Sequence, residues 1–231
     1  MTATLFLFLC LPPVPAVCAG SATISVDSAP LALESILKSV RQAEADIKDM
    51  SFSFRQKTAL KGAGEPQEVV GKVIMTRKPE RFRVDYESPV RQVAIYDGEN
   101  IMLYMPETGQ AFRQKAGRMD MKKMLGFDPS APMGAFEGRY SPELAGCADG
   151  VCRISFKPGD PAGTAWKLAI DSGNWLLNEI SFENSDMSMT ITCTNYRLNT
   201  GLKAKAFKFI LPPGTEVIDG IPILMGPGKA P

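Results

Sequence analysis

The clearest pattern in the chain is a regular alternation of apolar and polar residues between positions 77 and 106. Phe82, Val84 and Tyr86 share one face of an extended chain there, because strand side chains point alternately to two faces. Arginines and carboxylates occupy the other face. Pro89 and the Asp97–Gly98 pair interrupt the alternation, as is typical of strand ends and tight turns. The stretch therefore predicts an antiparallel meander with one apolar and one charged face.

Similar patterns cover most of the remaining chain. Apolar residues between positions 33 and 47 recur near period 3.6 and predict an amphipathic helix that lies against a sheet. We expect further strands, about ten or eleven in all, at 50–54, 69–75, 110–114, 151–156, 165–171, 176–182, 187–196 and 205–211. These elements predict a mainly β (α+β) fold. Its large antiparallel sheet must curve, close or be covered, because apolar faces and free edges are unfavourable in water.

Residues 119–138 depart from the strand pattern. The stretch 120–125 is predicted to be helical, with Met121, Met124 and Leu125 on one side. An irregular segment with several prolines follows at 128–138, and loops of this length are usually functional or mobile. The chain has 12 methionines, whose flexible side chains suit surfaces that accommodate variable apolar partners. Ordinary filling of a core is the alternative interpretation.

Composition excludes several functions. The chain contains no histidine, which removes Ser-His-Asp sites, haem ligation by histidine and the usual zinc sites. Its net charge is +1, so no strong field favours nucleic acid as a partner. Asp85, Glu87 and Asp97 lie in turns or on the charged face without a companion cluster. We expect neither an enzyme nor a metal or other cofactor.

The N-terminus is typical of an exported protein. An apolar run at 5–11 is too short to span a bilayer, and small residues follow it, which predicts a signal peptide over residues 1–19 that is cut after Ala19. A positively charged start is missing, and lipid attachment at Cys18 is the less favoured alternative. We expect one domain over 20–219 and a flexible tail over 220–231.

Export makes a disulfide favourable. Cys147 and Cys152 flank an Asp-Gly turn, a spacing compatible with a bond that closes a hairpin in an oxidising compartment. A redox-active pair is the less favoured alternative, because the Cys-x-x-Cys spacing is absent. Cys193 is then left over, and its place in an alternating apolar stretch predicts a buried free thiol.

Two stretches carry a resemblance to a known family. They are Lys-Pro-Glu-Arg-Phe-Arg-Val-Asp-Tyr (78–86) with Tyr-Asp-Gly-Glu-Asn-Ile-Met-Leu-Tyr-Met-Pro (96–106), and Ala-Phe-Lys-Phe-Ile-Leu-Pro-Pro-Gly-Thr-Glu-Val-Ile-Asp (206–219). In this order they resemble the periplasmic outer-membrane lipoprotein carriers of the LolA family. The resemblance implies an unclosed β-barrel with a helical lid over a hydrophobic cavity, which holds the acyl chains of lipoproteins that cross the periplasm.

The resemblance also suggests roles for particular residues. The helix at 119–127 and the loop at 133–136 fit the lid. The lipid-binding cavity is expected to be lined by Phe52, Phe54, Phe82, Val84, Tyr86, Leu103, Met121, Met124, Leu125 and Met189, although each could instead be plain core. In the family an arginine before the proline of a Pro-x-x-Phe motif ties the lid to the barrel. Here Lys78 occupies that position and Arg77 precedes it, so we expect the lid latch at these two residues.

The resulting hypothesis is a periplasmic, monomeric carrier. It would take acylated lipoproteins from an inner-membrane ABC-type extraction complex and pass them to the outer membrane, with an outer-membrane receptor as a further candidate partner. One alternative is a carrier of another lipid, such as a glycolipid or hopanoid. Another is a periplasmic lipid-sensing regulator, for which a second domain would be expected. The basic stripe Arg81, Arg83 and Arg91 could dock an acidic partner, or could simply be solvated.

Overall fold

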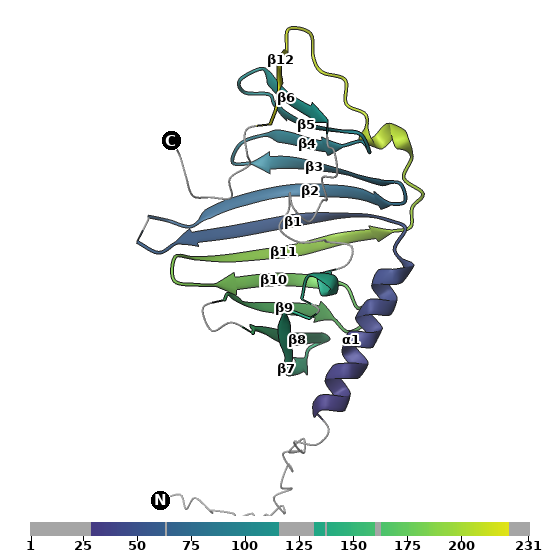
Figure 1. Cartoon of the computed structure of the whole chain (residues 1–231), viewed down its shortest axis with the longest axis vertical. Coiled ribbons are helices and arrows are strands. Elements are labelled where there is room, and N and C mark those ends of the chain that lie inside the picture. The colour runs from purple at the N-terminus through teal and green to yellow at the C-terminus, as the bar shows by residue number, and fades with distance from the viewer. Residues whose placement is uncertain (1–28, 63, 116–131, 137, 160–162, 222–231) are drawn as a thin grey trace, which may run out of the picture.

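The computed structural model describes residues 29–62, 64–115, 132–136, 138–159 and 163–221. They form one large sheet, one α-helix and two short 3-10 helices (Figure 1). The helices are α1 (Ala29–Asp46), η2 (Pro132–Ala135) and η3 (Ala204–Phe207). The strands are β1 (Asp49–Leu60), β2 (Gln67–Arg77), β3 (Glu80–Ser88), β4 (Gln92–Tyr96), β5 (Asn100–Met105), β6 (Gln110–Lys115), β7 (Tyr140–Ala148), β8 (Val151–Pro158), β9 (Ala165–Asp171), β10 (Leu177–Glu183), β11 (Met187–Leu198) and β12 (Glu216–Asp219).

The sheet contains 12 strands in the order β12-β6-β5-β4-β3-β2-β1-β11-β10-β9-β8-β7. It is not closed, because β12 and β7 form its two ends. Neighbouring strands are antiparallel except for β12, which lies parallel to β6. The prediction of a mainly β fold with an unclosed sheet is confirmed. The parallel pair departs from the expected antiparallel sheet and arises because the chain crosses the sheet between β11 and β12.

The main core lies on one face of this sheet, which we call the inner face. Alternate residues of β1 to β5 and β8 to β11 point toward it, as the period of two requires. Helix α1 contributes Ile36, Leu37 and Val40 to the same core, because these positions share one side of a helix. Figure 1 shows α1 beside the half of the sheet that ends in β7. The opposite, outer face carries most of the charged residues.

The predicted strand at 205–211 is wrong. The chain forms η3 there and then continues as an extended segment without a ladder partner. Phe207 is buried and the ring of Phe209 lies 5.3 Å from that of Tyr104. The alternation in the sequence therefore arises because Phe207 and Phe209 pack against the outer face of the sheet. The last strand of the described chain is β12.

Two strands, β7 and β12, escaped prediction. Strand β7 contains Pro142 and Gly146, and the register shifts between Leu144 and Gly146. Both residue types weaken a strand signal, but an edge strand tolerates them because one side of its backbone needs no partner. The expected loop at 128–138 contains η2, whereas the predicted helix at 119–127 and the predicted signal peptide lie outside the described residues. The described part of the chain has no helix with the length and hydropathy needed to cross a membrane.

Candidate functional site

The inner face is a continuous apolar surface, and α1 and η2 lie over the half of it that ends in β7. Five of the predicted cavity residues are buried in its core, namely Phe52, Phe54, Phe82, Val84 and Leu103. Tyr86 and Met189 are half-buried and pack at the border of the same cluster. Met121, Met124 and Leu125 lie outside the described residues. The structure thus brings all the described cavity candidates onto one face of the sheet.

A glycine makes room for aromatic packing on this face. Gly71 pairs with Phe54 on β1 and with Tyr86 on β3. The two rings meet edge to face across it, with their centroids 5.9 Å apart. A Cβ atom on Gly71 would lie 2.5 Å from the Asp85 carbonyl oxygen and 2.7 Å from the Phe54 ring. Only glycine fits between these rings without a shift.

The 3-10 helix η2 covers part of the inner face. Its Met133 and the following Phe136 are both buried in the core. The Phe136 ring stacks on that of Phe156, with centroids 4.4 Å apart, and contacts the Trp166 ring edge to face at 5.9 Å. The loop predicted to belong to the lid therefore lies on the apolar surface that the lid would cover.

Arg77 joins these covering elements to the sheet. Its guanidinium donates a hydrogen bond to the carbonyl oxygen of Glu44, near the end of α1. The Glu44 carboxylate in turn accepts a hydrogen bond of 3.0 Å from the backbone N–H of Met133 in η2. Lys78 is exposed, and among the described residues its ammonium group makes no hydrogen bond or ion pair. Of the two predicted latch residues, Arg77 is the one that contacts α1.

A second junction, which sequence analysis missed, lies where α1 meets β1. The buried carboxylate of Asp49 accepts hydrogen bonds from the backbone N–H groups of Thr200 and Gly201, at 2.8 and 3.0 Å. The Asn199 side chain accepts a 2.7 Å bond from the Lys48 N–H and donates a 3.0 Å bond to the Asp46 carbonyl. This polar cluster attaches the start of the outer-face segment to the end of α1. Asp49 directly precedes the predicted strand at 50–54 and lies on its polar side with Ser51 and Ser53, so the local sequence contains no signal for this cluster.

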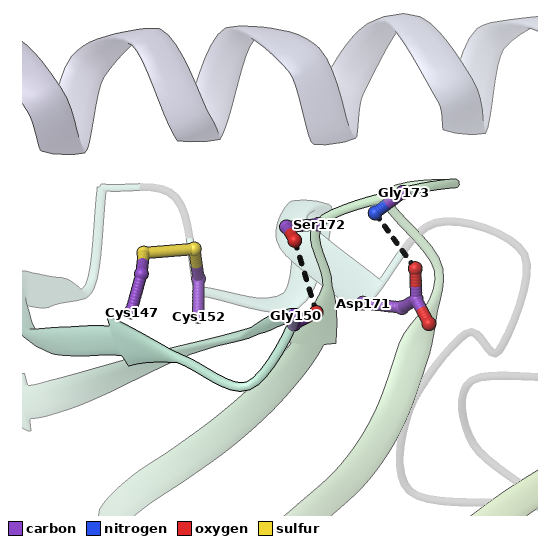
Figure 2. Close-up of a disulfide and its surroundings, with 6 residues drawn as sticks. All are labelled: Cys147, Gly150, Cys152, Asp171, Ser172 and Gly173. Carbon is purple, nitrogen blue, oxygen red and sulfur yellow. Dashed lines mark hydrogen bonds between the residues drawn. A yellow bond between two sulfur atoms is a disulfide. The ribbon is translucent and has the colours of Figure 1, made fainter.

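The predicted disulfide is present between Cys147 and Cys152, which lie opposite each other on β7 and β8 (Figure 2). Below α1 the turn of this hairpin also contacts the turn between β9 and β10. Ser172 donates to the Gly150 carbonyl from both its backbone N–H and its hydroxyl, at 2.8 and 3.0 Å. The disulfide thus stabilises the end of the sheet over which α1 passes.

Cys193 is a buried free thiol, as predicted. Burial raises the pKa of this thiol to about 11, against a weaker opposing effect of its hydrogen bond with Tyr196. The Tyr196 ring stacks on Phe52, and its hydroxyl donates a 2.7 Å hydrogen bond to the Leu177 carbonyl. The cysteine is therefore a neutral, inward-facing part of the apolar surface at neutral pH.

The carboxylates considered for acid–base chemistry have structural partners on the outer face. Asp85 forms an ion pair of 2.7 Å with Arg83, and Glu87 forms one of 2.6 Å with Lys72. Asp97 accepts hydrogen bonds from two backbone N–H groups in its turn. These bonds lower the pKa of Asp97 although partial burial acts to raise it. Each of the three carboxylates is thus engaged by an ion pair or by the backbone of its own turn.

Two of the three arginines in the basic stripe make contacts within the chain. The Arg83 guanidinium lies 5.5 Å from the centre of the Phe209 ring. The Arg81 side chain donates a 2.8 Å hydrogen bond to the Asp97 carbonyl oxygen. Arg91 is exposed in the connection between β3 and β4. Arg81 and Arg83 therefore stabilise the outer face through contacts within the chain, and Arg91 is exposed to solvent.

Comparison with known proteins places these features in a family. The family model described as "Outer membrane lipoprotein carrier protein LolA" matches residues 45–210. An outer-membrane lipoprotein carrier protein of Dechloromonas aromatica is 26% identical over 191 residues, covering 80% of this chain and 85% of the relative. One of Neisseria meningitidis is 27% identical over 210 residues, covering 88% and 94%.

Solved structures share the fold at low sequence identity. An uncharacterized conserved protein of Thermus thermophilus superposes with a TM-score of 0.54 at 12% identity, covering 82% of this chain and 99% of that one. The crystal structure of MucB gives a TM-score of 0.50 at 13% identity, covering 78% and 63%. These likenesses concern the architecture alone.

Proposed function

Because the chain belongs to the LolA family of outer-membrane lipoprotein carrier proteins, we propose that it carries lipoprotein acyl chains across the periplasm on its inner face. The observation that supports this most is the continuous apolar surface formed by alternate residues of the sheet, which α1 and η2 cover in the half that ends in β7. An acyl chain that enters would replace contacts of these covering elements with contacts of its own.

The energetics of such a carrier require a cover that can move. Burying an acyl chain stabilises the complex by about 0.8 kcal/mol per methylene. Release of the chain therefore requires a gain in free energy elsewhere that offsets this stabilisation. Closure of α1 and η2 over the emptied surface supplies this free energy, because it buries the same apolar side chains again. The closed state is held by the Arg77–Glu44 and Glu44–Met133 hydrogen bonds. We assign the latch to Arg77, and Lys78 has no part in it.

The direction of transport follows from the partners at each end. An inner-membrane ABC-type extraction complex would supply energy to load the carrier, and an acceptor at the outer membrane would receive the cargo, with or without a dedicated receptor. A different lipid, such as a glycolipid or hopanoid, would use the same apolar surface. The cargo therefore has to be identified by measurement.

Two adjacent residues on β11 allow a matched test. Met189 packs on the inner core, whereas Thr190 belongs to the outer face and lines a groove there. Both are half-buried, so Met189→Glu and Thr190→Glu place the same charge on opposite faces. With the fluorescent fatty acid cis-parinaric acid as probe, we expect Met189→Glu to weaken binding at least tenfold and Thr190→Glu to bind like the wild type.

A synthetic triacylated lipopeptide as competitor then tests the cargo class. Displacement of the probe by the lipopeptide supports the lipoprotein carrier, whereas displacement only by a glycolipid or hopanoid supports the other-lipid carrier. Equal probe binding by both glutamate variants would contradict an inner-face site.

A further inference from the structure

The segment between β11 and β12 carries an unusually exposed aliphatic side chain. Ile210 is 92% exposed, whereas Val217, the next most exposed large apolar residue of the described chain, is 46% exposed. Moving an isoleucine side chain out of water is strongly favourable. A position this exposed therefore calls for an explanation beyond packing within the chain.

The exposure of Ile210 is imposed by well-anchored neighbours. Phe207 is 1% exposed, and the Phe209 ring lies between Tyr104 and the Arg83 guanidinium. The backbone at Lys208 is extended, with φ −94° and ψ 134°, so side chains alternate along this stretch. The phenylalanines point to the sheet, and Lys208 and Ile210 are left exposed.

The chain resumes regular structure soon after Ile210. Thr215 donates to the Pro212 carbonyl from its backbone N–H and its hydroxyl, at 3.2 and 2.8 Å. Strand β12 then pairs with β6. Ile210 thus projects from a short connection that is fixed at both ends.

Along the chain, the charged residues next to Ile210 are all basic. Between positions 197 and 215 the sequence contains Arg197, Lys203, Lys205 and Lys208 and no carboxylate. All four side chains are exposed. A groove of about 480 Å³ borders Ile210 and continues the apolar surface through Met102, Phe209 and Val217. Its charged lining residues are Arg113, Lys208 and Asp97.

An exposed aliphatic side chain among lysines matches the surface of an anionic bilayer. Apolar side chains insert at the level of the headgroups, while basic residues are attracted to acidic phospholipids. We propose that the segment 203–213 is a membrane-docking site, in which Ile210 inserts into a leaflet rich in anionic lipid. In Figure 1 the segment runs along the half of the sheet that ends in β12, whereas α1 lies beside the half that ends in β7. Docking there would leave the inner face and its cover free to open.

The test uses the full protein purified from the periplasm, so that the wild type and all variants share the same N-terminus. Vesicles of phosphatidylethanolamine with phosphatidylglycerol are compared with vesicles of phosphatidylcholine in a flotation assay. We expect the wild type to float with the anionic vesicles only. Ile210→Ser should weaken this binding about tenfold or more, and Lys203, Lys205 and Lys208 should each contribute about a fivefold factor when changed to Gln.

A matched control is Val90→Ser, since Val90 is 39% exposed in a connection elsewhere on the sheet and should leave flotation unchanged. Neither position is buried, so both variants should fold like the wild type, which thermal unfolding verifies. Equal flotation of wild type and Ile210→Ser overturns the proposal. Absence of wild-type binding to anionic vesicles also overturns it, and an acidic protein surface would then be the complementary partner to seek.

The fatty-acid probe separates this proposal from the carrier function. Ile210→Ser should bind cis-parinaric acid like the wild type, because Ile210 belongs to the outer-face segment. Loss of vesicle binding with normal probe binding is therefore the result that we expect. Loss of both in this variant would contradict a docking role that is separate from cargo binding.

Discussion

Gly71 shows how a single position determines the inner face. Its neighbours Phe54 and Tyr86 meet only because no Cβ atom stands between them. Gly71→Ala would place a methyl group against the Asp85 carbonyl and the Phe54 ring. We expect it to lower the free energy of unfolding by about 1–3 kcal/mol, the usual range for overpacking.

Chemical denaturation measures this change, and Gly134→Ala is the control. A Cβ atom on Gly134 would meet no heavy atom within 4 Å, so that variant should unfold within about 0.5 kcal/mol of the wild type. An unchanged midpoint for Gly71→Ala would show that the two rings are not held as the structure places them.

Arg77 and Lys78 offer a second comparison at the scale of single residues. Arg77→Leu removes the hydrogen bond to Glu44 and should lower stability by about 1–3 kcal/mol. Hydrogen exchange should accelerate in α1 and η2, because both depend on Glu44. Lys78→Leu should leave the exchange of these elements unchanged. Acceleration in the Lys78 variant, or in neither, would remove Arg77 from the latch.

Single residues were predicted well where alternation controls them. Phe52, Phe54, Phe82, Val84 and Leu103 are all on the face that the period of two assigns to them. The contact of Arg77 could not be predicted, because it depends on where α1 ends in space. Phe82 is 1% exposed, so a glutamate there would be buried without a partner and would destabilise the fold. Half-buried Met189 is therefore the sharper test of cargo binding.

At the scale of elements, the β7–β8 hairpin depends on its disulfide. The bond joins residues five positions apart, and closing so short a loop stabilises the folded state by about 2 kcal/mol on chain-entropy grounds. We expect a reductant to lower the unfolding free energy of the wild type by about that amount. Double replacement of Cys147 and Cys152 by alanine should give a similar stability that no longer responds to the reductant.

The outcome that contradicts this account is a reductant effect that persists in the double variant. Such a result would assign the sensitivity to another cysteine. Cys193 is the free thiol of the described chain, and its burial protects it from reagents in the folded state.

Elements with a strong period were predicted, and those at the sheet edges were not. Strand β7 was missed because Pro142 and Gly146 usually interrupt strands, although a strand at the edge of a sheet tolerates both residues. The segment at 205–211 was misassigned because packing on the outer face gives the same alternation as a ladder. In both cases the deciding information is the position of the segment relative to the sheet, which the local sequence does not contain.

The whole molecule combines two surfaces with different chemistry. The inner face is apolar and is covered by α1 and η2 in the half that ends in β7, and the outer face carries the C-terminal segment with Ile210. The Asp49 and Asn199 cluster joins the end of α1 to the start of that segment. The fold class could be predicted from strand periodicity, whereas this connection between the two surfaces emerges only in three dimensions.

Native mass spectrometry of the protein, isolated from the periplasm without detergent, tests the carrier function most directly. The account predicts an adduct with the mass of an acylated lipoprotein on the wild type. Met189→Glu should lack this adduct and Thr190→Glu should keep it. Bare wild-type protein, from cells in which outer-membrane lipoproteins are being made, would contradict the proposal that this chain carries them.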